Sequence, residues 1–297
     1  MNRIISNASE IDFSIKELPE MPQPARVLMV KPTYFDVEYV INPHMKGFIG
    51  GVDKMQAQNE WEHLEDGFEE LGYRVIKEEG VRDLPDMVFC ANQCLPFIDE
   101  NENLKAVMSI MHSDQRKPEV SHIEKIIQSL GYKTFHLDDN QGDFEGMGDA
   151  IWHFKRKLLW GGHGFRTSAT VYEQVSELFD TSVILLELKD DYFYHLDTCF
   201  CSLNETSALI YPQAFTDKGL EIIHKLHSTV IEGTEYEAKK QFAVNAVCPD
   251  GRNVLIQQGN TDVNRKLRNH GFHVHEYSTY EFIKSGGSVF CMKLLLW

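Results

Sequence analysis

Hydrophobic and polar positions along this chain follow a pattern that predicts one structural unit repeated five times. Three segments share a spelling in which an amphipathic run ends at a glycine and an alternating strand follows. Two further helix-to-strand joins, at 170–186 and 220–231, lack the glycine. The three segments with the glycine are Leu71-Gly72-Tyr73-Arg74-Val75, Leu130-Gly131-Tyr132-Lys133-Thr134 and His270-Gly271-Phe272-His273-Val274.

Pairs of strands joined by tight turns precede the later helices and complete the unit. Short apolar strands flank turns at 99–103, 155–157, 204–205 and 249–251. Turn-forming residues between such strands indicate hairpins. The predicted unit is therefore strand, strand, helix, strand, repeated at intervals of roughly 40 to 60 residues, which is close to the range of repeat architectures.

The first unit is complete only if the two ends of the chain meet. The strand at 26–30 and the helix at 54–71 lack a hairpin partner, and the C-terminal strand through Cys291 can supply it. Such closure hides the edges of sheets. No linker rich in Pro, Gly or Ser interrupts the series. We therefore expect residues 1–297 to form a single α/β domain.

Composition narrows the class of protein. Of the 297 residues, 42% are hydrophobic and 25% are charged, which is typical of a globular protein with a sizeable core. The chain has no signal-peptide core and no apolar run of about 18 residues, and its six cysteines are irregularly spaced, as suits reduced thiols. These points predict a cytoplasmic protein without membrane contact. The formal charge of −16 argues against a nucleic acid as partner and favours a cationic small molecule.

Polar residues that could carry chemistry occupy the same place in different units. They lie between the last strand of one unit and the first strand of the next, or early in that strand, at 86–92, 145–149, 195–197 and Cys291. If the units surround an axis, equivalent positions meet at one end of it. The sequence therefore predicts one shared site.

Cys291, His195 and Asp197 supply a thiol, an imidazole and a carboxylate, which are the parts of a nucleophile with its proton shuttle and orienting group. Gly286-Gly287 precedes a short apolar strand and lets the backbone approach a ligand, which would place Cys291 at the mouth of that strand. Taken alone, a cysteine usually packs as a small hydrophobe, and a histidine beside aromatic residues is usually a half-buried one. Only the rest of the chain favours the catalytic interpretation.

Five segments in chain order resemble the guanidino-group-modifying (pentein) superfamily. This superfamily contains arginine deiminases, dimethylarginine hydrolases, arginine:glycine amidinotransferases and arginine dihydrolases. The resemblance runs from about Arg26 to the C-terminus and implies a five-bladed α/β propeller, which agrees with the repeat count. The segments are Asn42-Pro43 with the run before it, Leu84-Pro85-Asp86-Met87-Val88-Phe89-Cys90-Ala91-Asn92, Phe144-Glu145-Gly146-Met147-Gly148-Asp149-Ala150, Phe193-Tyr194-His195-Leu196-Asp197-Thr198 and the strand of Cys291.

The resemblance also implies a mechanism. A guanidinium is planar and cationic, so its site needs acceptors in its plane and a soft nucleophile facing its central carbon. Cys291 resembles the family nucleophile, which attacks that carbon to form a covalent amidino-thioether. His195 resembles the residue that protonates the departing ammonia and then deprotonates water. Glu145 resembles the carboxylate that grips guanidinium nitrogens and orients the histidine, and Asp197 resembles a further acceptor.

Six more residues are implied as substrate-binding. Arg166 follows a glycine-rich loop at a loop-to-helix junction, where it can hold a substrate α-carboxylate in a bidentate fork. Arg116 resembles a second arginine with this role. A surface salt bridge is the alternative for either arginine, and a solvated turn is the alternative for the acidic residues of the motifs. The six residues are Asn42, Asp86, Asn92, Arg116, Asp149 and Arg166.

Asn92 separates members of the superfamily. Deiminases carry Asp at this point, whereas arginine dihydrolases resemble this chain in having Asn at both positions 42 and 92. Loss of one carboxylate weakens the attraction for a cation and favours a neutral substrate. We therefore predict an arginine dihydrolase that converts arginine to ornithine, carbon dioxide and ammonia. Dimethylarginine hydrolase, arginine deiminase and amidinotransferase activities are the alternatives within the fold.

Two alternatives come from other classes of protein. A thiol peptidase is disfavoured because the cysteine comes last and lacks the aromatic signatures of peptidase thiols. An inactive arginine-binding protein is disfavoured because all the matched chemical residues are intact. His273 and His275 lack a third ligand at zinc-like spacing, and no Gly-rich phosphate loop is present. We therefore predict no metal and no cofactor, and the pattern leaves homo-oligomerisation open.

Overall fold

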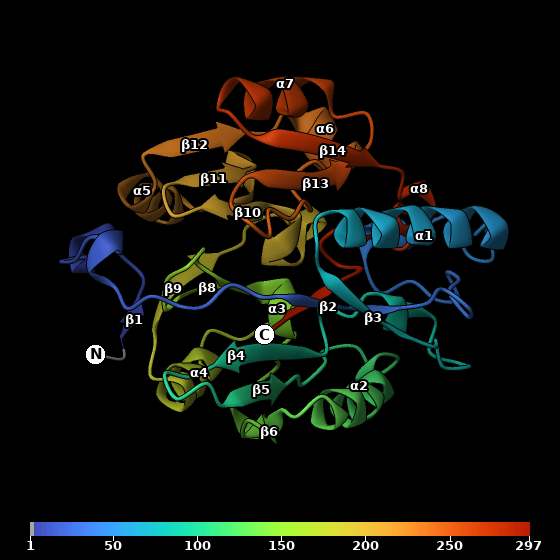
Figure 1. Cartoon of the computed structure of the whole chain (residues 1–297), viewed down its shortest axis with the longest axis horizontal. Helices are drawn as coiled ribbons and strands as arrows, with labels where there is room; N and C mark the ends of the chain where they lie inside the picture. Colours follow the sequence, from blue (N-terminus) through green and yellow to red (C-terminus); the bar gives the residue numbers. More distant parts are fainter. Residues whose placement is uncertain (1–2) are drawn as a thin grey trace.

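The computed structural model describes residues 3–297, whose strands form five separate sheets in a mixed α/β fold (Figure 1). Four of these sheets contain an antiparallel strand pair extended by a parallel strand, as the repeat pattern predicts. In strand order the sheets are β1 (Ile4–Ile5), β9 (Ser182–Glu187), β8 (Leu158–His163) and β7 (Ala150–Trp152); β10 (Phe200–Asn204), β11 (Ser207–Ile210) and β12 (Thr229–Glu232); β13 (Asn253–Gln257) and β14 (His273–Tyr277); β15 (Leu294–Leu296), β2 (Arg26–Val30) and β3 (Arg74–Glu78); and β4 (Cys94–Ile98), β5 (Leu104–Met108) and β6 (Lys133–Phe135).

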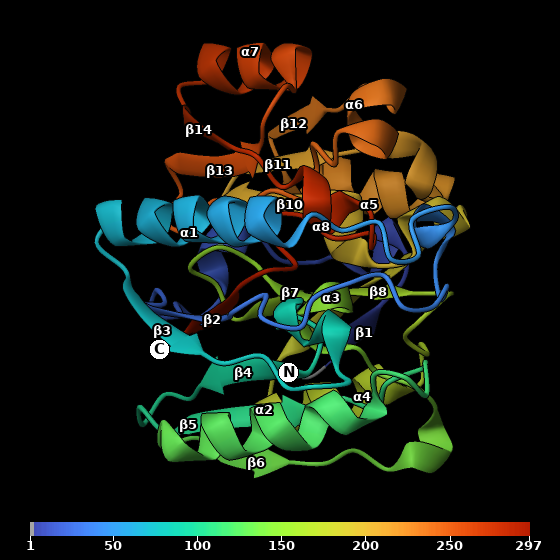
Figure 2. The same cartoon turned by 90° about the vertical axis from the view of Figure 1, so that its right-hand side faces the viewer.

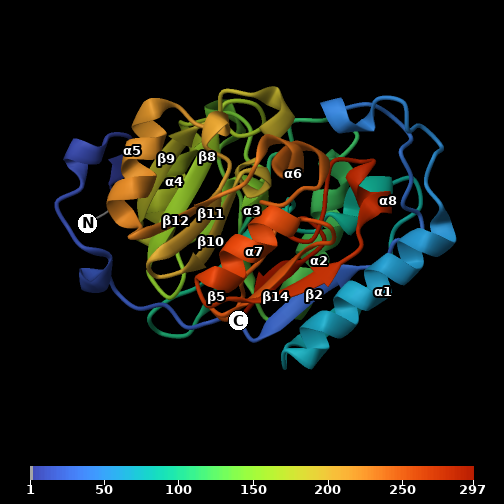
Figure 3. The same cartoon turned by 90° about the horizontal axis from the view of Figure 1, so that it is seen from above.

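One longer helix in each unit connects the strands that run parallel, and these helices lie at the outside of the molecule (Figures 1 and 3). The short helix α3 instead lies near the middle in all three views (Figures 1, 2 and 3). The connecting helices are α1 (Lys54–Glu70), α2 (Lys117–Ser129), α4 (Val171–Phe179), α5 (Asp217–Leu226) and α7 (Thr261–Asn269), and the shorter ones are α3 (Gly146–Asp149), α6 (Glu235–Lys240) and α8 (Tyr280–Ile283).

The sequence of α1 explains both of its ends. The Asp53 carboxylate accepts hydrogen bonds from two backbone N–H groups of the first turn, which caps the helix. Trp61, Leu64 and Phe68 face inward and are buried. Gly72, with a φ of +87°, allows the left-handed turn that leads into β3. A glycine in the same conformation follows α2 and α7, so all three glycine-marked joins are confirmed.

The two ends of the described chain meet in one sheet. Strand β15 pairs antiparallel with β2, with Leu294 opposite Leu28, and β2 pairs parallel with β3. This pairing confirms that the C-terminal strand completes the first unit. Cys291 itself lies outside the strand, because the Met292 N–H bonds the Ser288 carbonyl (3.2 Å) and forms a turn ahead of β15. The prediction that Cys291 belongs to the strand is therefore wrong.

Two further details differ from the sequence prediction. The expected strand at 246–248 makes only one isolated bridge, between Val247 and Leu255, so its sheet has two strands. The backbone groups of the preceding Asn245 bond Phe242 and Phe290. They are therefore not available to extend the antiparallel pairing with β13. Strand β1 adds an unpredicted parallel partner to β9.

The core consists of apolar side chains between the sheets and their helices. Among the largest fully buried ones are Trp61, Trp160, Tyr172, Phe179 and Phe282. None of the helices within residues 3–297 is long and apolar enough to cross a membrane.

Candidate active site

Seven of the ten predicted residues lie in segments between sheets, whereas Asn42, Arg116 and Arg166 lie between a strand and the helix that follows it. Each of the ten side chains is no more than 8% exposed, which excludes both the surface salt bridges and the solvated turns considered as alternatives. Glu145 directly precedes α3, and Asp149 ends it, so these two residues belong to a helical turn and not to a loop. The ten residues are Asn42, Asp86, Asn92, Arg116, Glu145, Asp149, Arg166, His195, Asp197 and Cys291.

Six of the ten predicted residues line one small pocket beside the thiol of Cys291. The other four, Glu145, Asp149, His195 and Asp197, do not line the pocket, but each of them contacts a lining residue or another of the four. The six predicted lining residues are Asn42, Asp86, Asn92, Arg116, Arg166 and Cys291, and the pocket is completed by Ile41, Met45, Phe89, Tyr194, Ser285 and Gly287.

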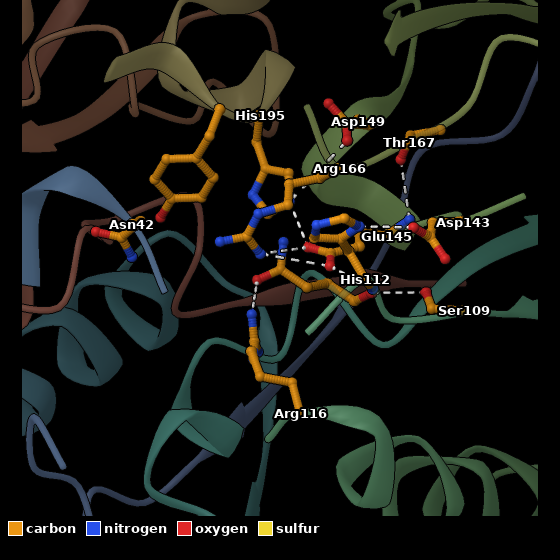
Figure 4. Close-up of polar contacts among 12 residues, drawn as sticks. Asn42, Ser109, His112, Arg116, Asp143, Glu145, Asp149, Arg166, Thr167 and His195 are labelled. Carbon is orange, nitrogen blue, oxygen red and sulfur yellow. Dashed lines mark hydrogen bonds and ion pairs between the residues drawn. The ribbon is translucent and has the colours of Figure 1, made fainter. Parts of the chain in front are cut away.

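Glu145 is the centre of the polar network (Figure 4). Its carboxylate accepts hydrogen bonds from the His112 backbone N–H (3.0 Å) and from Arg166 Nη1 (3.3 and 3.4 Å). His195 Nε2 lies 2.6 Å from Glu145 Oε2. Burial opposes ionisation, but the charge of Arg166 and the hydrogen bond with His195 hold the pKa of Glu145 well below its usual range. Glu145 therefore presents a negative charge to the imidazole of His195.

The imidazole of His195 is held between two carboxylates and a glycine. Asp149 Oδ2 lies 4.0 Å from Nε2, on the same side as Glu145. A Cβ atom at Gly148 would lie 2.3 Å from Asn92 Nδ2 and 3.2 Å from His195 Nδ1, so only glycine lets α3 pass this close to both side chains. Burial raises the pKa of Asp149 to about 6. The site therefore pairs a histidine with two carboxylates of different acidity.

The thiol of Cys291 contacts Asp197 and not the histidine ring. Its Sγ lies 3.2 Å from Asp197 Oδ2 and accepts a hydrogen bond from Asn245 Nδ2 (3.2 Å). Burial and the neighbouring Asp197 carboxylate raise the pKa of Cys291 well above that of a free thiol. Burial also raises the pKa of Asp197 to about 7. Attack by sulfur therefore needs a positive charge nearby, as a guanidinium would supply.

Four polar atoms of the ten predicted residues have no hydrogen-bond partner within residues 3–297. They are Asp86 Oδ2, Asp149 Oδ2, Asp197 Oδ1 and Asn92 Nδ2, and all four are buried. Buried polar atoms are normally paired, so an unpaired cluster beside a pocket indicates a polar ligand. Three acceptors and one donor suit a small molecule that carries N–H groups and an acceptor atom.

The two predicted arginines have different partners. Arg116 forms a fork with Glu119 at 2.9 to 3.2 Å, and its Nη1 donates to Asn92 Oδ1 (2.9 Å). Arg166 bonds Glu145 and donates from Nη2 to the Ile41 carbonyl (2.8 Å). Arg116 thus acts on the site through the amide of Asn92, while Arg166 lies directly beside the carboxylate that holds His195.

Sequence reasoning missed several contributors. Glu119 lies on the helix that begins after Arg116, three residues along, a spacing that indicates contact on one helix face. Tyr194 donates from its hydroxyl to the Gly286 carbonyl (2.5 Å) and lies under the Arg166 guanidinium. Asn245 lies between the last strand of the fourth unit and the first strand of the fifth, where the repeat pattern already placed site residues in the other units.

Within residues 3–297 one group of side chains could hold a metal ion. Glu65, Asp66 and Glu69 on α1 approach one another, but they lie away from the pocket, and Lys77 already bonds Glu65 (2.8 Å). His275 bonds Asn253 (2.9 Å) and belongs to no cluster of three possible metal ligands within residues 3–297. None of these groups lines the pocket beside Cys291.

Comparison with known proteins connects this site to a family. The family model described as "N,N dimethylarginine dimethylhydrolase, eukaryotic" matches residues 46–296. An uncharacterised protein of Caenorhabditis elegans is 36% identical over 274 residues, which cover 91% of this chain and 93% of that protein. The N(G),N(G)-dimethylarginine dimethylaminohydrolase of Mycobacterium tuberculosis is 33% identical over 276 residues, which cover 92% of this chain and 86% of that enzyme.

A third relative is the bifunctional arginine dihydrolase/ornithine cyclodeaminase ArgZ of Synechocystis sp., at 33% identity over 284 residues. The match covers 92% of this chain but only 38% of ArgZ, so the chain spans less than half of that enzyme. The N-terminal domain of ArgZ, solved with a cysteine replaced by serine and with substrate bound, superimposes with a TM-score of 0.86 at 32% identity. That superposition covers 91% of this chain and 97% of the domain.

Proposed function

Because the chain belongs to the N,N-dimethylarginine dimethylhydrolase family, we propose that it is a cysteine hydrolase of guanidino groups, and specifically an arginine dihydrolase. The family membership confirms the resemblance found in the sequence motifs. The observation that carries the choice of a dihydrolase is the orientation of the Asn92 amide. Its oxygen accepts from Arg116 Nη1 (2.9 Å), and its Nδ2 has no partner within residues 3–297.

The orientation of Asn92 follows from its neighbour. An arginine guanidinium has only donors, so the amide must turn its oxygen toward Arg116 and its NH₂ group away from it. The unpaired group of Asn92, which lies against Gly148 beside the pocket, is therefore a donor. A donor suits the oxygen of a neutral ureido group, whereas an Asp at this position would offer only an acceptor when ionised. This supports binding of citrulline as well as arginine.

The proposed reaction begins with the thiolate of Cys291. It attacks the central guanidinium carbon, an S–C bond forms, and ammonia departs with a proton from His195, which leaves an amidino-thioether. His195 then takes a proton from water, the hydroxide adds to the same carbon, and the S–C bond breaks to release citrulline. A second cycle on the ureido carbon releases the other ammonia and a carbamate, which loses carbon dioxide to give ornithine.

The geometry supports this division of labour. Glu145, ionised beside Arg166, lies 2.6 Å from His195 Nε2 and orients the imidazole that gives its proton to ammonia. Asp197 holds the thiol at 3.2 Å and is an acceptor for the incoming guanidinium. The ArgZ domain with an asparagine replaced by serine was solved covalently bound to a reaction intermediate, at a TM-score of 0.85 and 32% identity. A covalent route is therefore consistent with the relatives.

We expect wild-type protein to convert arginine through citrulline to ornithine and Asn92→Asp to stop at citrulline. The carboxylate cannot donate to the ureido oxygen, and an unpaired or repelled buried acceptor costs about 1–3 kcal/mol, which slows the second step roughly tenfold to hundredfold. Quantifying citrulline and ornithine over time, with arginine or citrulline as substrate, measures both steps.

Cys291→Ser should fold and form neither product, because a hydroxyl is a far weaker nucleophile.

The same assay measures the main alternative. The family model and the mycobacterial relative favour dimethylarginine hydrolysis as the second candidate. Incubation with N,N-dimethylarginine would then release dimethylamine and citrulline. Wild-type protein that accumulates citrulline from arginine with no ornithine would contradict the dihydrolase proposal.

We also propose that residues 1–297 form one catalytic domain in which the five sheets are the blades of an α/β propeller. The sheet orders and the pairing of β15 with β2 support this arrangement. Within it, Asn42, Asp86 and Asp149 bind substrate beside the residues named above.

A further inference from the structure

The segment between β12 and β13 carries no residue that the sequence assigns to the site. In the structure this segment brings Asn245 into the interior, where its side chain is fully buried. The Asn245 backbone N–H donates to the Phe242 carbonyl (3.1 Å), and the Asn245 carbonyl accepts from the Phe290 N–H (3.1 Å). The fifth unit therefore packs directly against the turn that carries Cys291.

The side-chain amide of Asn245 is bonded on both ends. Its Oδ1 accepts hydrogen bonds from the backbone N–H groups of Ser288 (3.0 Å) and Cys291 (3.4 Å). Its Nδ2 donates to the Asp197 backbone carbonyl (3.0 Å) and to Cys291 Sγ (3.2 Å). One amide thus joins the loop of the proposed nucleophile to the loop of Asp197.

Only one orientation of this amide is compatible with its surroundings. A flipped amide would turn its NH₂ group toward two backbone N–H donors and its oxygen toward the Asp197 carbonyl. Both contacts would be repulsive and buried, which is costly. The N–H group of Asn245 must therefore face the sulfur of Cys291.

A donor at the sulfur acts against the other influences there. Burial and the Asp197 carboxylate disfavour the thiolate and raise the pKa of Cys291, whereas the N–H of Asn245 stabilises the thiolate. Nδ2 is the side-chain donor that the structure places on Sγ within residues 3–297. His195 is bonded to Glu145 and makes no such bond to the sulfur in this structure.

We propose that Asn245 is a positioning residue that orients the Cys291 sulfur for attack and stabilises its thiolate. It does so by clamping the turn of Ser288 and Cys291 against Asp197 while it donates one N–H to the sulfur. The inference rests on the proposed function, because it takes Cys291 as the nucleophile. It adds a contribution from the fifth unit, so that every segment between sheets serves the same site.

The test measures the reactivity of Cys291 directly, without a substrate. Iodoacetamide alkylates thiolates, and mass spectrometry of the peptide that contains Cys291 gives its rate at each pH. Asn245→Asp keeps the shape and the acceptor but replaces the donor by a negative charge. We expect it to raise the midpoint of the alkylation profile by about one pH unit or more, which lowers the rate about tenfold below the midpoint. Arginine turnover should show a similar loss in kcat, with a smaller change in KM.

Asn260→Asp is the matched control. Asn260 is also fully buried, and its Nδ2 donates to the backbone carbonyls of Gln241 (3.1 Å) and Gln257 (2.8 Å), away from the pocket. It should lose stability and keep the wild-type alkylation profile. If Asn245→Asp does not fold, Asn245→Ala takes its place, since it removes the donor without adding charge.

The outcomes separate this inference from the proposed function. An Asn245 variant that folds and alkylates with the wild-type rate and pH profile would overturn the inference, whatever the substrate proves to be. If wild-type protein does not hydrolyse arginine but Asn245→Asp still shifts the alkylation profile, the proposed function alone would be overturned.

Discussion

At the scale of single residues, burial and neighbouring charges shift the pKa values of the site's carboxyl groups in opposite directions. Burial raises the pKa of Asp149 to about 6 and that of Asp197 to about 7. Glu145 is equally buried, yet Arg166 and His195 hold its pKa low. Ionisable groups whose environments separate their pKa values in this way are typical of acid–base sites. Glu145 is therefore the permanent anion, while the other two carboxyl groups can change charge near neutral pH.

Lys293 is a buried cation two residues after the nucleophile. Its side chain has no exposed surface, its Nζ has no hydrogen-bond partner within residues 3–297, and it lies 3.1 Å from the centre of the Phe290 ring. Burial lowers the pKa of Lys293 from 10.5 to about 8. Protonation of this amine is therefore less favourable in the folded protein than in the unfolded chain.

We expect Lys293→Met to raise the free energy of unfolding at pH 7. Each unit of a pKa difference corresponds to about 1.4 kcal/mol, so the gain should be a few kcal/mol. Between pH 8 and 10.5 the unfolded wild-type chain binds more protons at this amine than the folded one, so the wild type recovers stability as pH rises. Urea unfolding of both proteins across this range should show the advantage of the variant shrinking. A difference that stays constant with pH would contradict a depressed pKa.

At the scale of elements, the turn between α8 and Cys291 depends on Gly286. Its φ is +87°, and an added Cβ atom would lie 2.9 Å from both amide atoms of Asn42 and from the Tyr194 hydroxyl. The backbone carbonyl of Gly286 also accepts the Tyr194 hydrogen bond. This glycine therefore lets three separate segments meet beside the pocket.

We expect Gly286→Ala to lower kcat/KM for arginine and to destabilise the fold. The left-handed backbone strain costs about 1 kcal/mol or more, and the new methyl group displaces Asn42 and the turn that carries Cys291. Gly131→Ala is the matched control, because Gly131 has a φ of +94° but no atom within 4 Å of a new Cβ. It should lose stability and retain activity. Equal activity losses in the two variants would indicate that strain alone, and not the contact with Asn42, matters.

At the scale of the whole molecule, stability depends on the pairing of the chain's two ends. Strand β15 contributes Leu294 and Leu296 to the core, while Leu295 on the opposite face is only partly buried. This alternation is the normal geometry of a strand. The same strand begins three residues after Cys291, so the closure of the sheet also holds Cys291 in place.

We expect Leu296→Ala to lower the free energy of unfolding by about 2–5 kcal/mol, as is usual when a fully buried leucine leaves a cavity. Leu295→Ala should cost less, because its side chain keeps some contact with solvent. Urea unfolding of the two variants against wild type measures the difference. Equal losses would mean that β15 does not close the sheet as the structure indicates.

The sequence alone predicted the repeat, the joining of the ends and the residues that gather at the site. The glycine-marked joins, the hairpins around 99–103, 155–157 and 204–205, and the family motifs are local signals, because they depend on residues a few positions apart. Four segments in equivalent places of the repeat predicted one site, and the structure brings their side chains together in the interior. The family could therefore be identified from the sequence motifs without the tertiary structure.

Only the tertiary structure decided how the polar atoms pair. The direction of the Asn92 amide, set by Arg116, and the contact of Asn245 with Cys291 join residues 24 and 46 positions apart. Spacing along the chain does not encode these choices, because each depends on which donor or acceptor the neighbouring sheet presents. Burial then sets the pKa values, since exclusion of water acts on the packed molecule and not on the sequence.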